Sequence, residues 1–346
     1  MAAGTLMIRA DASIAIGTGH VMRCLALAQA WQDTGGQAVF VMTESPPAIE
    51  DRLRAEKVLI ERLQTAPGTT EDADQTLGLA RKHDAAWVVA DGYRFGAEYQ
   101  RRLKDAAVRL LFVDDNGHAS AYCADLVLNQ NAHASEDFYR ERSPQTRLLL
   151  GPRYALLRRE FAAWRNWQRA VPPIGRRVLV TMGGSDPDNV TLKVIEALNA
   201  AHIEGLEAAV VVGGTNPNVA LIEEAITRSA YPIRLVKNTN SMAELMAWAD
   251  IAVAAAGSTC WEICSLGLPN ILLVLVDHQE PVAKAVEAAN AGLSLGWSWR
   301  SGISTIAGAV RDLLQDVRQR ETMAKHARAL VDGCGAQRVV SMLAAN

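Results

Sequence analysis

A glycine-bearing loop near the N-terminus combines backbone freedom with a histidine. Residues 9–23 contain Gly17, Gly19 and His20, and an apolar segment precedes them. Glycines allow a tight turn and the close approach of a ligand, and a helix starting at about His20 would offer unpaired N–H groups to an anion. Histidine exchanges protons near neutral pH, so His20 is a candidate base. The alternative is an ordinary strand-to-helix turn in which His20 caps or packs.

Two loops in the C-terminal half have the composition of an anion site. Backbone N–H groups and hydroxyls before a helix suit a diphosphate. Glu262 lies one turn into the helix expected after the second of these loops, where a carboxylate can accept from the two hydroxyls of a ribose. The alternative is an ordinary capped helix start in each case. The residues concerned are Gly183, Gly184, Ser185 and Asn189 in the first loop, and Gly257, Ser258 and Thr259 in the second.

Several other classes of site are disfavoured by the same residues. No Gly-Lys-Ser/Thr follows the glycines, so neither C-terminal loop is a P-loop. Met22 stands where a dinucleotide fingerprint has its third glycine, which argues against a nicotinamide oxidoreductase. Cys260 and Cys264 lack further ligands at zinc spacing and are expected to pack in the interior.

Length and composition indicate a cytoplasmic protein of two domains. The chain has 346 residues and a net charge of −3 without a basic block, which disfavours nucleic acid as a partner. No apolar run reaches the roughly 20 residues of a membrane span, and no secretory signal is recognisable. Five scattered cysteines fit reduced thiols.

Short apolar strands alternate with helical segments in both halves, which predicts two parallel sheets covered by helices. The expected strands are Leu6–Ala10, Ala38–Met42, Trp87–Ala90, Arg109–Val113, Leu126–Asn129, Arg177–Met182, Ala208–Val212, Ile233–Val236, Ile251–Ala255 and Asn270–Leu275. The expected helices lie near 20–34, 46–56, 71–83, 96–107, 188–201, 216–229, 241–248, 258–266, 280–291, 315–331 and 336–343.

The domain boundary is expected in the arginine- and tryptophan-rich segment that ends in two prolines, Pro172 and Pro173. We expect an N-terminal Rossmann-like domain over 1–160 and a linker over 161–175. A C-terminal Rossmann-like domain follows over 176–335, and the helix of 336–346 packs back on the first domain. Such domains face a cleft at the carboxyl ends of their strands, where ligands bind in open α/β sheets.

Four motifs occur together and in order along the chain. They are Arg-x-Asp-x-Ser…Gly-x-Gly-His-x-x-Arg-Cys, Gly-Pro-Arg-Tyr-Ala-Leu-Leu-Arg starting at Gly151, Gly-Gly-Ser-Asp-Pro…Asn ending at Asn189, and Ala-Gly-Ser-Thr…Trp-Glu ending at Glu262. In this combination the chain resembles the nucleotide-sugar hydrolases of pseudaminic acid synthesis, the PseG/SpsG type. The resemblance covers nearly the whole chain.

The resemblance implies a glycosyltransferase-B fold related to the peptidoglycan N-acetylglucosaminyltransferase. It implies UDP on the C-terminal domain and the sugar facing the N-terminal domain. Water would attack the anomeric carbon of UDP-2,4-diacetamido-2,4,6-trideoxy-β-L-altropyranose, with inversion, and UDP would leave without a metal or another cofactor. His20 would be the catalytic base.

Matched positions extend the candidate site. Tyr93 follows an expected strand and would face the sugar, although a surface turn is the alternative. The loop 237–242 would face uracil, or else be a polar connector. The resemblance assigns sugar contacts to Asp11, Gly17, Gly19, Arg23, Tyr93, Arg153, His278 and Gln279. It assigns UDP contacts to Gly183, Gly184, Ser185, Asn189, Asn240, Met242, Gly257, Ser258, Thr259 and Glu262.

One departure from the family concerns the sugar side. His278 stands where the family carries asparagine, so the substrate or the reaction can differ. Asp114 and Asp115 are candidates for a sugar or metal site, but neighbouring residues at a strand end point in opposite directions. His118 is expected to be a solvated loop residue.

Two further functions stay open. A glycosyltransferase of the same fold would use the same base on an acceptor hydroxyl, and its donor would be a UDP- or CMP-activated sugar. A nucleotide-sugar-binding protein without turnover would keep its affinity for UDP. In each case the expected partner is a small nucleotide sugar, with the chain as a monomer or weak dimer.

Overall fold

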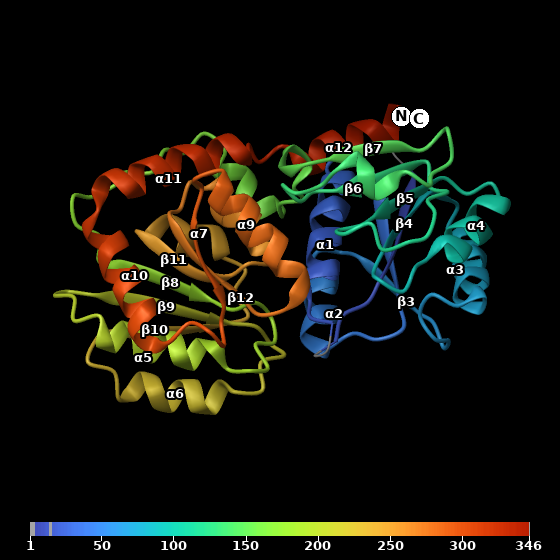
Figure 1. Ribbon diagram of the computed structural model, residues 1–346. Coiled ribbons are helices and arrows are strands. Elements are labelled where there is room, and N and C mark those ends of the chain that lie inside the picture. Colours follow the sequence, from blue (N-terminus) through green and yellow to red (C-terminus); the bar gives the residue numbers. More distant parts are fainter. Residues whose placement is uncertain (1–3, 14–15, 346) are drawn as a thin grey trace. The chain divides into compact units, whose positions relative to one another are not determined.

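The computed structural model describes residues 4–13 and 16–345, and the chain divides into two compact units. Unit 1 comprises Met1–Arg159 and Cys334–Asn346, and unit 2 comprises Glu160–Gly333. Each unit contains one parallel β-sheet covered by helices on both faces, as the alternation of apolar strands and helices predicts (Figure 1).

The sheet of unit 1 has seven parallel strands in the order β3-β2-β1-β4-β5-β6-β7. Its strands are β1 (Thr5–Ala10), β2 (Gln37–Met42), β3 (Leu59–Arg62), β4 (Ala85–Asp91), β5 (Leu110–Val113), β6 (Leu126–Asn129) and β7 (Arg147–Leu150). Its helices are α1 (Gly19–Gln32), α2 (Pro47–Ala55), α3 (Thr70–Lys82), α4 (Ala97–Asp105) and α12 (Gly335–Ala345). Short 3₁₀ turns occur at Glu136–Tyr139 and Pro152–Tyr154.

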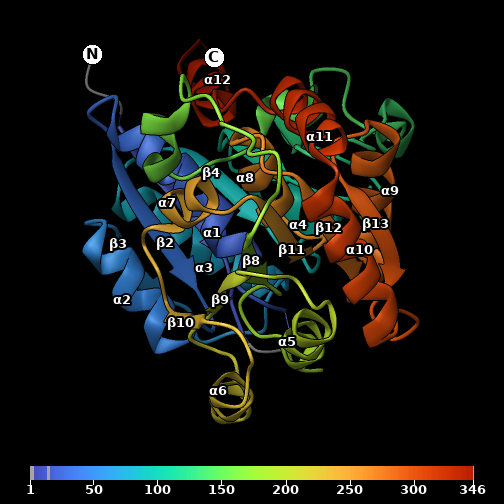
Figure 2. The same cartoon turned by 90° about the vertical axis from the view of Figure 1, so that its left-hand side faces the viewer.

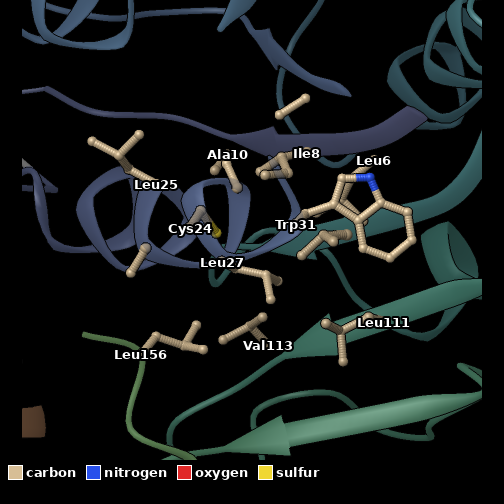
Figure 3. Close-up of a cluster of buried hydrophobic side chains, with 14 of the residues drawn as sticks. Leu6, Ile8, Ala10, Cys24, Leu25, Leu27, Trp31, Leu111, Val113 and Leu156 are labelled. Atoms are coloured by element: carbon tan, nitrogen blue, oxygen red, sulfur yellow. The ribbon is translucent and has the colours of Figure 1, made fainter. Parts of the chain in front are cut away.

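Successive side chains of these strands point to opposite faces, so each strand feeds two cores. Leu6, Ile8 and Ala10 of β1 pack with α1 and α12, whereas Met7 packs with α3 and α4 on the other face. Figure 3 shows the first core, with the α1 side chains directed at β1 and at residues of β5. The sheet is therefore anchored on both sides, which fixes the positions of the loops at its carboxyl edge.

Helix α12 completes unit 1 although it ends the chain. It lies along α1 (Figure 1) and contributes Val339, Val340 and Leu343 to the same core. The indole N–H of Trp87 donates to the carbonyl of Leu343 at 3.0 Å. Burial of these apolar side chains, worth about 1.5–3 kcal/mol each, accounts for the attachment of the chain end.

The sheet of unit 2 has six parallel strands in the order β10-β9-β8-β11-β12-β13. Its strands are β8 (Arg177–Thr181), β9 (Glu207–Val212), β10 (Ile233–Lys237), β11 (Ile251–Ala255), β12 (Asn270–Val274) and β13 (Leu293–Trp297). Its helices are α5 (Val190–Ala200), α6 (Val219–Thr227), α7 (Met242–Trp248), α8 (Thr259–Ser265), α9 (Glu280–Ala288), α10 (Ile303–Gln315) and α11 (Val317–Leu330), with a 3₁₀ turn at Asp277–Gln279. Another 3₁₀ turn, Arg159–Trp164, begins at the last residue before the boundary between the units. Figure 2 shows this unit from a second side.

The arginine-rich segment after residue 159 is fastened to unit 2 by hydrogen bonds to carbonyl groups. Arg169 donates to the carbonyls of Met246, Ala249 and Leu266, at or just beyond the carboxyl ends of α7 and α8. Arg320 donates to carbonyls at the end of α10 and to Pro172. These cations satisfy carbonyls that a helix end leaves without a partner.

The order of the strands decides where the candidate site residues meet. In unit 1 the chain moves from β1 to β2 on one side and from β4 to β5 on the other, so the loops after β1 and β4 diverge at the carboxyl edge. The loops after β8 and β11 stand in the same relation in unit 2. Open α/β sheets bind ligands at such switch points. Among the described residues, no helix is long and apolar enough to cross a membrane.

The attachment of α12 can be measured as stability. We expect Leu343→Ala to lower the free energy of unfolding of unit 1 by about 2–5 kcal/mol, because Leu343 is fully buried beneath the sheet. The control is Leu59→Ala, since Leu59 is 54% exposed in the same unit. Chemical denaturation followed by circular dichroism gives both values. Equal losses for the two variants would contradict this packing.

Candidate active site

His20 and Asp91 form a hydrogen-bonded pair at the switch point of unit 1. His20 lies in the first turn of α1, and Asp91 is the last residue of β4. The Nδ1 atom of His20 is 2.7 Å from Oδ1 of Asp91. Both residues are buried, and the His20 side chain keeps 11% of its surface exposed. The neighbouring strands β1 and β4 thus bring together two residues 71 positions apart.

The partner of Nδ1 fixes which imidazole nitrogen is able to accept a proton. Nη2 of Arg23 also lies 3.2 Å from Nδ1, but this nitrogen already donates to Asp91 at 2.7 Å, so the shorter contact of Nδ1 with Asp91 decides the tautomer. An ionised carboxylate oxygen only accepts hydrogen bonds, so Nδ1 carries the hydrogen and donates it to Asp91. The neutral ring then has its lone pair on Nε2. A carboxylate placed in this way also stabilises the imidazolium that forms when Nε2 takes a proton. The geometry is that of a general base with an orienting acid.

Arg23 holds Asp91 and Asp115 in place from the next turn of α1. Its Nε and Nη2 atoms donate to the two oxygens of Asp91 at 2.7 Å each, and Nη1 donates to Asp115 at 2.7 Å. Burial by itself would raise the pKa of Asp91, but the charges and hydrogen bonds of Arg23 and His20 lower that pKa to about 2. Asp91 is therefore ionised at neutral pH.

The structure gives Arg23 a positioning role. Its guanidinium is buried and donates hydrogen bonds to two carboxylates, those of Asp91 and Asp115. The contact with sugar that the resemblance assigns to Arg23 stays a prediction. Cys24 adds a further donor, because its Sγ lies 3.2 Å from Asp91 and burial raises the pKa of the thiol.

Tyr93 and Asp115 lie beside this pair. The ring of Tyr93 stands edge-on to that of His20 with centroids 5.0 Å apart, and its hydroxyl donates to Asp115 at 3.1 Å. Tyr93 is 40% exposed, which suits the predicted contact with a ligand. Asn131 also donates to Asp115, at 2.7 Å.

Asp114 and Asp115 have separate sets of partners, as expected for neighbours at a strand end. Asp114 accepts from three successive backbone N–H groups and from the hydroxyl of Tyr122. His118 also contacts Asp114, with Nδ1 at 2.9 Å, and its side chain is only 19% exposed. The expectation that His118 is a solvated loop residue is therefore wrong, because a buried carboxylate draws the ring inward.

The other predicted residues of unit 1 lie in different settings. Asp11 is paired with Arg9 at 2.8 Å and accepts the backbone N–H of Thr43 at 2.7 Å, so it ties the end of β1 to that of β2. Gly17 has a φ of +75° and exchanges backbone hydrogen bonds with Ser13, which closes the loop before α1. Gly19 begins α1.

Arg153 lies farther along unit 1, on the 3₁₀ turn after β7, and its guanidinium covers the ring of Tyr154. Its backbone carbonyl accepts from Arg338 at 2.8 Å. The sugar contacts assigned to Asp11, Gly17, Gly19 and Arg153 all remain predictions.

In unit 2 the glycine loop after β8 is locked to the loop after β9. A Cβ on Gly213 would lie 2.3 Å from the carbonyl oxygen of Gly184, so these backbones touch. Gly183 has a φ of +84°, and the carbonyl of Gly184 accepts the hydroxyl of Thr215 at 2.8 Å. Ser185 follows, half-buried, and Asn189 precedes α5 in a left-handed conformation.

The loop after β11 leads into α8 with an exposed serine. Ser258 is the N-cap of α8, Thr259 is its first residue, and Glu262 is half-buried in its first turn. Gln279 approaches Gly257, since a Cβ there would lie 3.7 Å from its Nε2 atom. The structure therefore brings Gln279 to the Gly257 loop. His278 is exposed on the adjoining 3₁₀ turn.

The loop predicted to face uracil lies after β10. Asn240 is exposed, and Met242 is buried as the first residue of α7. Contacts of this loop with a base stay a prediction. Cys260 and Cys264 are buried, and burial raises the pKa of both thiols, as their expected packing role requires. Among the described residues no group of histidine, cysteine and acidic side chains has the arrangement of a metal site.

Comparison with known proteins shows which proteins the chain is similar to. Residues 178–337 match the glycosyltransferase family 28 C-terminal domain. The spore coat polysaccharide biosynthesis protein SpsG of Bacillus subtilis (strain 168) is 29% identical over 71% of this chain and 73% of its own length. A UDP-2,4-diacetamido-2,4,6-trideoxy-beta-L-altropyranose hydrolase of Campylobacter jejuni is 24% identical over 80% of this chain and 94% of its own.

The chain is thus similar to both proteins over most of its length, and its C-terminal half matches the family 28 domain. A crystal structure of Acinetobacter baumannii MurG has the same fold, with a TM-score of 0.70, 17% identity, and coverage of 99% of this chain and 100% of that one. The fold is therefore the glycosyltransferase-B fold, as the sequence motifs predict.

The pairing of His20 with Asp91 predicts one tautomer. Nitrogen NMR of labelled protein should show the neutral form of His20 with hydrogen on Nδ1 and the lone pair on Nε2. Asp91→Asn should shift the ring towards the other tautomer, since an amide can donate as well as accept. His83, whose Nε2 contacts Glu61, serves as an internal reference. A wild-type His20 with hydrogen on Nε2 alone would refute the assignment.

Proposed function

We propose that the chain is a UDP-sugar hydrolase that releases a diacetamido-trideoxy sugar and UDP, with His20 as the general base. The observation that carries the proposal is the 2.7 Å contact between Nδ1 of His20 and Asp91, which leaves Nε2 as a base beside the half-exposed Tyr93. Similarity to a UDP-sugar hydrolase and to the glycosyltransferase family 28 domain supports the broader statement that the chain is an enzyme acting on nucleotide sugars.

In the proposed reaction a water molecule gives its proton to Nε2 of His20 as its oxygen bonds to the anomeric carbon. The bond from that carbon to the UDP oxygen breaks, and UDP takes the electron pair. Asp91 stabilises the imidazolium that results. A general base of this kind contributes about 10²–10⁴-fold to a rate.

We assign UDP to the loops of unit 2. The backbone N–H groups at Ser258 and Thr259 and the glycines after β8 suit the diphosphate, whose charge rises as it leaves. Glu262 would accept from the ribose hydroxyls, and Asn240 and Met242 would line the base. We assign the sugar to the carboxyl edge of unit 1, where His20 and Tyr93 lie.

A glycosyltransferase is the second candidate, because the C-terminal half matches glycosyltransferase family 28. Incubation with UDP-2,4-diacetamido-2,4,6-trideoxy-β-L-altropyranose alone separates the two. Equal amounts of free sugar and UDP, followed by NMR, are expected for the hydrolase. Turnover only after a hydroxyl acceptor is added would favour the transferase and contradict the proposal.

His20→Ala should reduce kcat by about 10²–10⁴-fold and leave the affinity for UDP unchanged, because the base is lost and the nucleotide loops belong to unit 2. Calorimetry with UDP and a UDP-release assay give the two quantities. Wild-type kcat in the variant would remove His20 from the proton transfer. A parallel loss of UDP affinity would place the nucleotide elsewhere.

Glu262→Ala should weaken UDP binding by about 1–3 kcal/mol through the loss of charged hydrogen bonds to ribose. Glu196→Ala is the matched control, since Glu196 is exposed on α5 of the same unit. Calorimetric titration with UDP and with uracil nucleotides that lack ribose hydroxyls measures the effect. Equal UDP affinity in wild type and Glu262→Ala would exclude Glu262 from the site.

A further inference from the structure

The network around His20 contains more negative than positive charge. The guanidinium of Arg23 forms ion pairs with two carboxylates, Asp91 and Asp115. Burial by itself would raise the pKa of Asp115, but the charge of Arg23 and its hydrogen bond outweigh this and lower that pKa. Asp91 and Asp115 each carry one negative charge, and Arg23 carries one positive charge. With a neutral His20 the network therefore has one net negative charge, which lies at the edge assigned to the sugar.

The two carboxylates differ in their capacity for a ligand. Asp91 is fully buried and already accepts from His20, from two nitrogens of Arg23 and from Cys24. A carboxylate has about four acceptor positions, so Asp91 is saturated. Asp115 differs, because its side chain is 13% exposed.

The two oxygens of Asp115 are unequally used. Oδ1 accepts from Arg23 and from Asn131, each at 2.7 Å. Oδ2 accepts from the hydroxyl of Tyr93 at 3.1 Å. An ionised carboxylate oxygen takes about two donors, so Oδ2 has an acceptor position left on the side where Tyr93 is exposed.

A second acceptor lies behind Asp115. Nε2 of His133 is 3.3 Å from the backbone carbonyl of Asp115, so Nε2 carries the hydrogen and Nδ1 carries the lone pair. This Nδ1 is buried and has no hydrogen-bond partner among the described residues. Burial lowers the pKa of His133, which keeps the ring neutral. A buried polar atom without a partner costs about 1–3 kcal/mol, which a ligand donor or an ordered water would recover.

We propose that Asp115 is a specificity-determining residue that selects sugars presenting N–H or O–H donors and rejects sugars that carry a negative charge. Oδ2 of Asp115 accepts from the sugar, and its charge repels a carboxylate on the same sugar. Two acetamido groups supply such N–H donors without charge. This inference rests on the proposed function for the placement of the sugar beside His20.

The test compares the binding of two UDP-sugars that differ in charge, UDP-glucose and UDP-glucuronate, in the His20→Ala background, where turnover is suppressed. We expect UDP-glucuronate to bind at least about tenfold more weakly than UDP-glucose, because like charges several ångströms apart near a protein surface repel by at least that much. Adding Asp115→Asn should reduce this ratio to within about twofold. Affinity for UDP itself should not change, which also reports that the double variant is folded.

Asp114→Asn is the matched control, because Asp114 is the adjacent carboxylate with a separate set of partners. It should lower the melting temperature and keep the tenfold ratio. Raising the salt concentration from 0.05 to 0.5 M in the His20→Ala protein should weaken the discrimination, since screening is independent of any fold defect. A ratio that Asp115→Asn leaves unchanged, or a ratio near one in the background protein, would overturn the inference. All of these are binding or stability measurements that require no turnover, so failure of the hydrolase assay is a separate result.

Discussion

The hydrogen bond between His20 and Asp91 is the constraint on which the candidate active site depends. It fixes the tautomer of the imidazole, and Arg23 and Cys24 hold the carboxylate that fixes it. All four groups are buried, so each needs the others to satisfy its polar atoms. The loss of one partner would leave a charge or a donor unsatisfied, and the base would lose its orientation.

The two units use the same topology for opposite electrostatic tasks. In unit 1 two ionised carboxylates, Asp91 and Asp115, and the α1 side chain of Arg23 lie at the carboxyl edge of the sheet, which suits an uncharged sugar and a base. In unit 2 the corresponding loops carry glycines, hydroxyl groups and a helix start, which suit an anion. The distribution of charge therefore agrees with a nucleotide on unit 2 and a sugar on unit 1, as proposed.

Much of the fold follows from local sequence pattern. Strands such as Ile251–Ala255 are fully apolar and buried, and they were predictable from that run alone. Strand β3 was not expected, because Leu59–Arg62 contains two charged residues and lies half-exposed at the edge of the sheet. Strands β7 and β13 and helix α10 were also missed. In β13, Ser294 and Gly296 interrupt the apolar pattern.

The site could be predicted only in part. The glycine loop and its histidine mark His20, and acids at strand ends drew attention to Asp115. The pairing of His20 with Asp91, however, joins residues 71 positions apart, and it depends on β1 and β4 being neighbours. The resemblance assigns Arg23 to the substrate, which stays a prediction, and only the structure shows its nitrogens bound to Asp91 and Asp115.

The most direct test of the central claim is hydrolysis in water enriched with oxygen-18. The protein would be incubated with UDP-2,4-diacetamido-2,4,6-trideoxy-β-L-altropyranose, and early products would be followed by NMR and mass spectrometry. Attack of an activated water on the anomeric carbon predicts the label on the sugar, none on UDP, and an inverted anomer as first product. Label in the terminal phosphate of UDP, or a first product of retained configuration, would contradict the account.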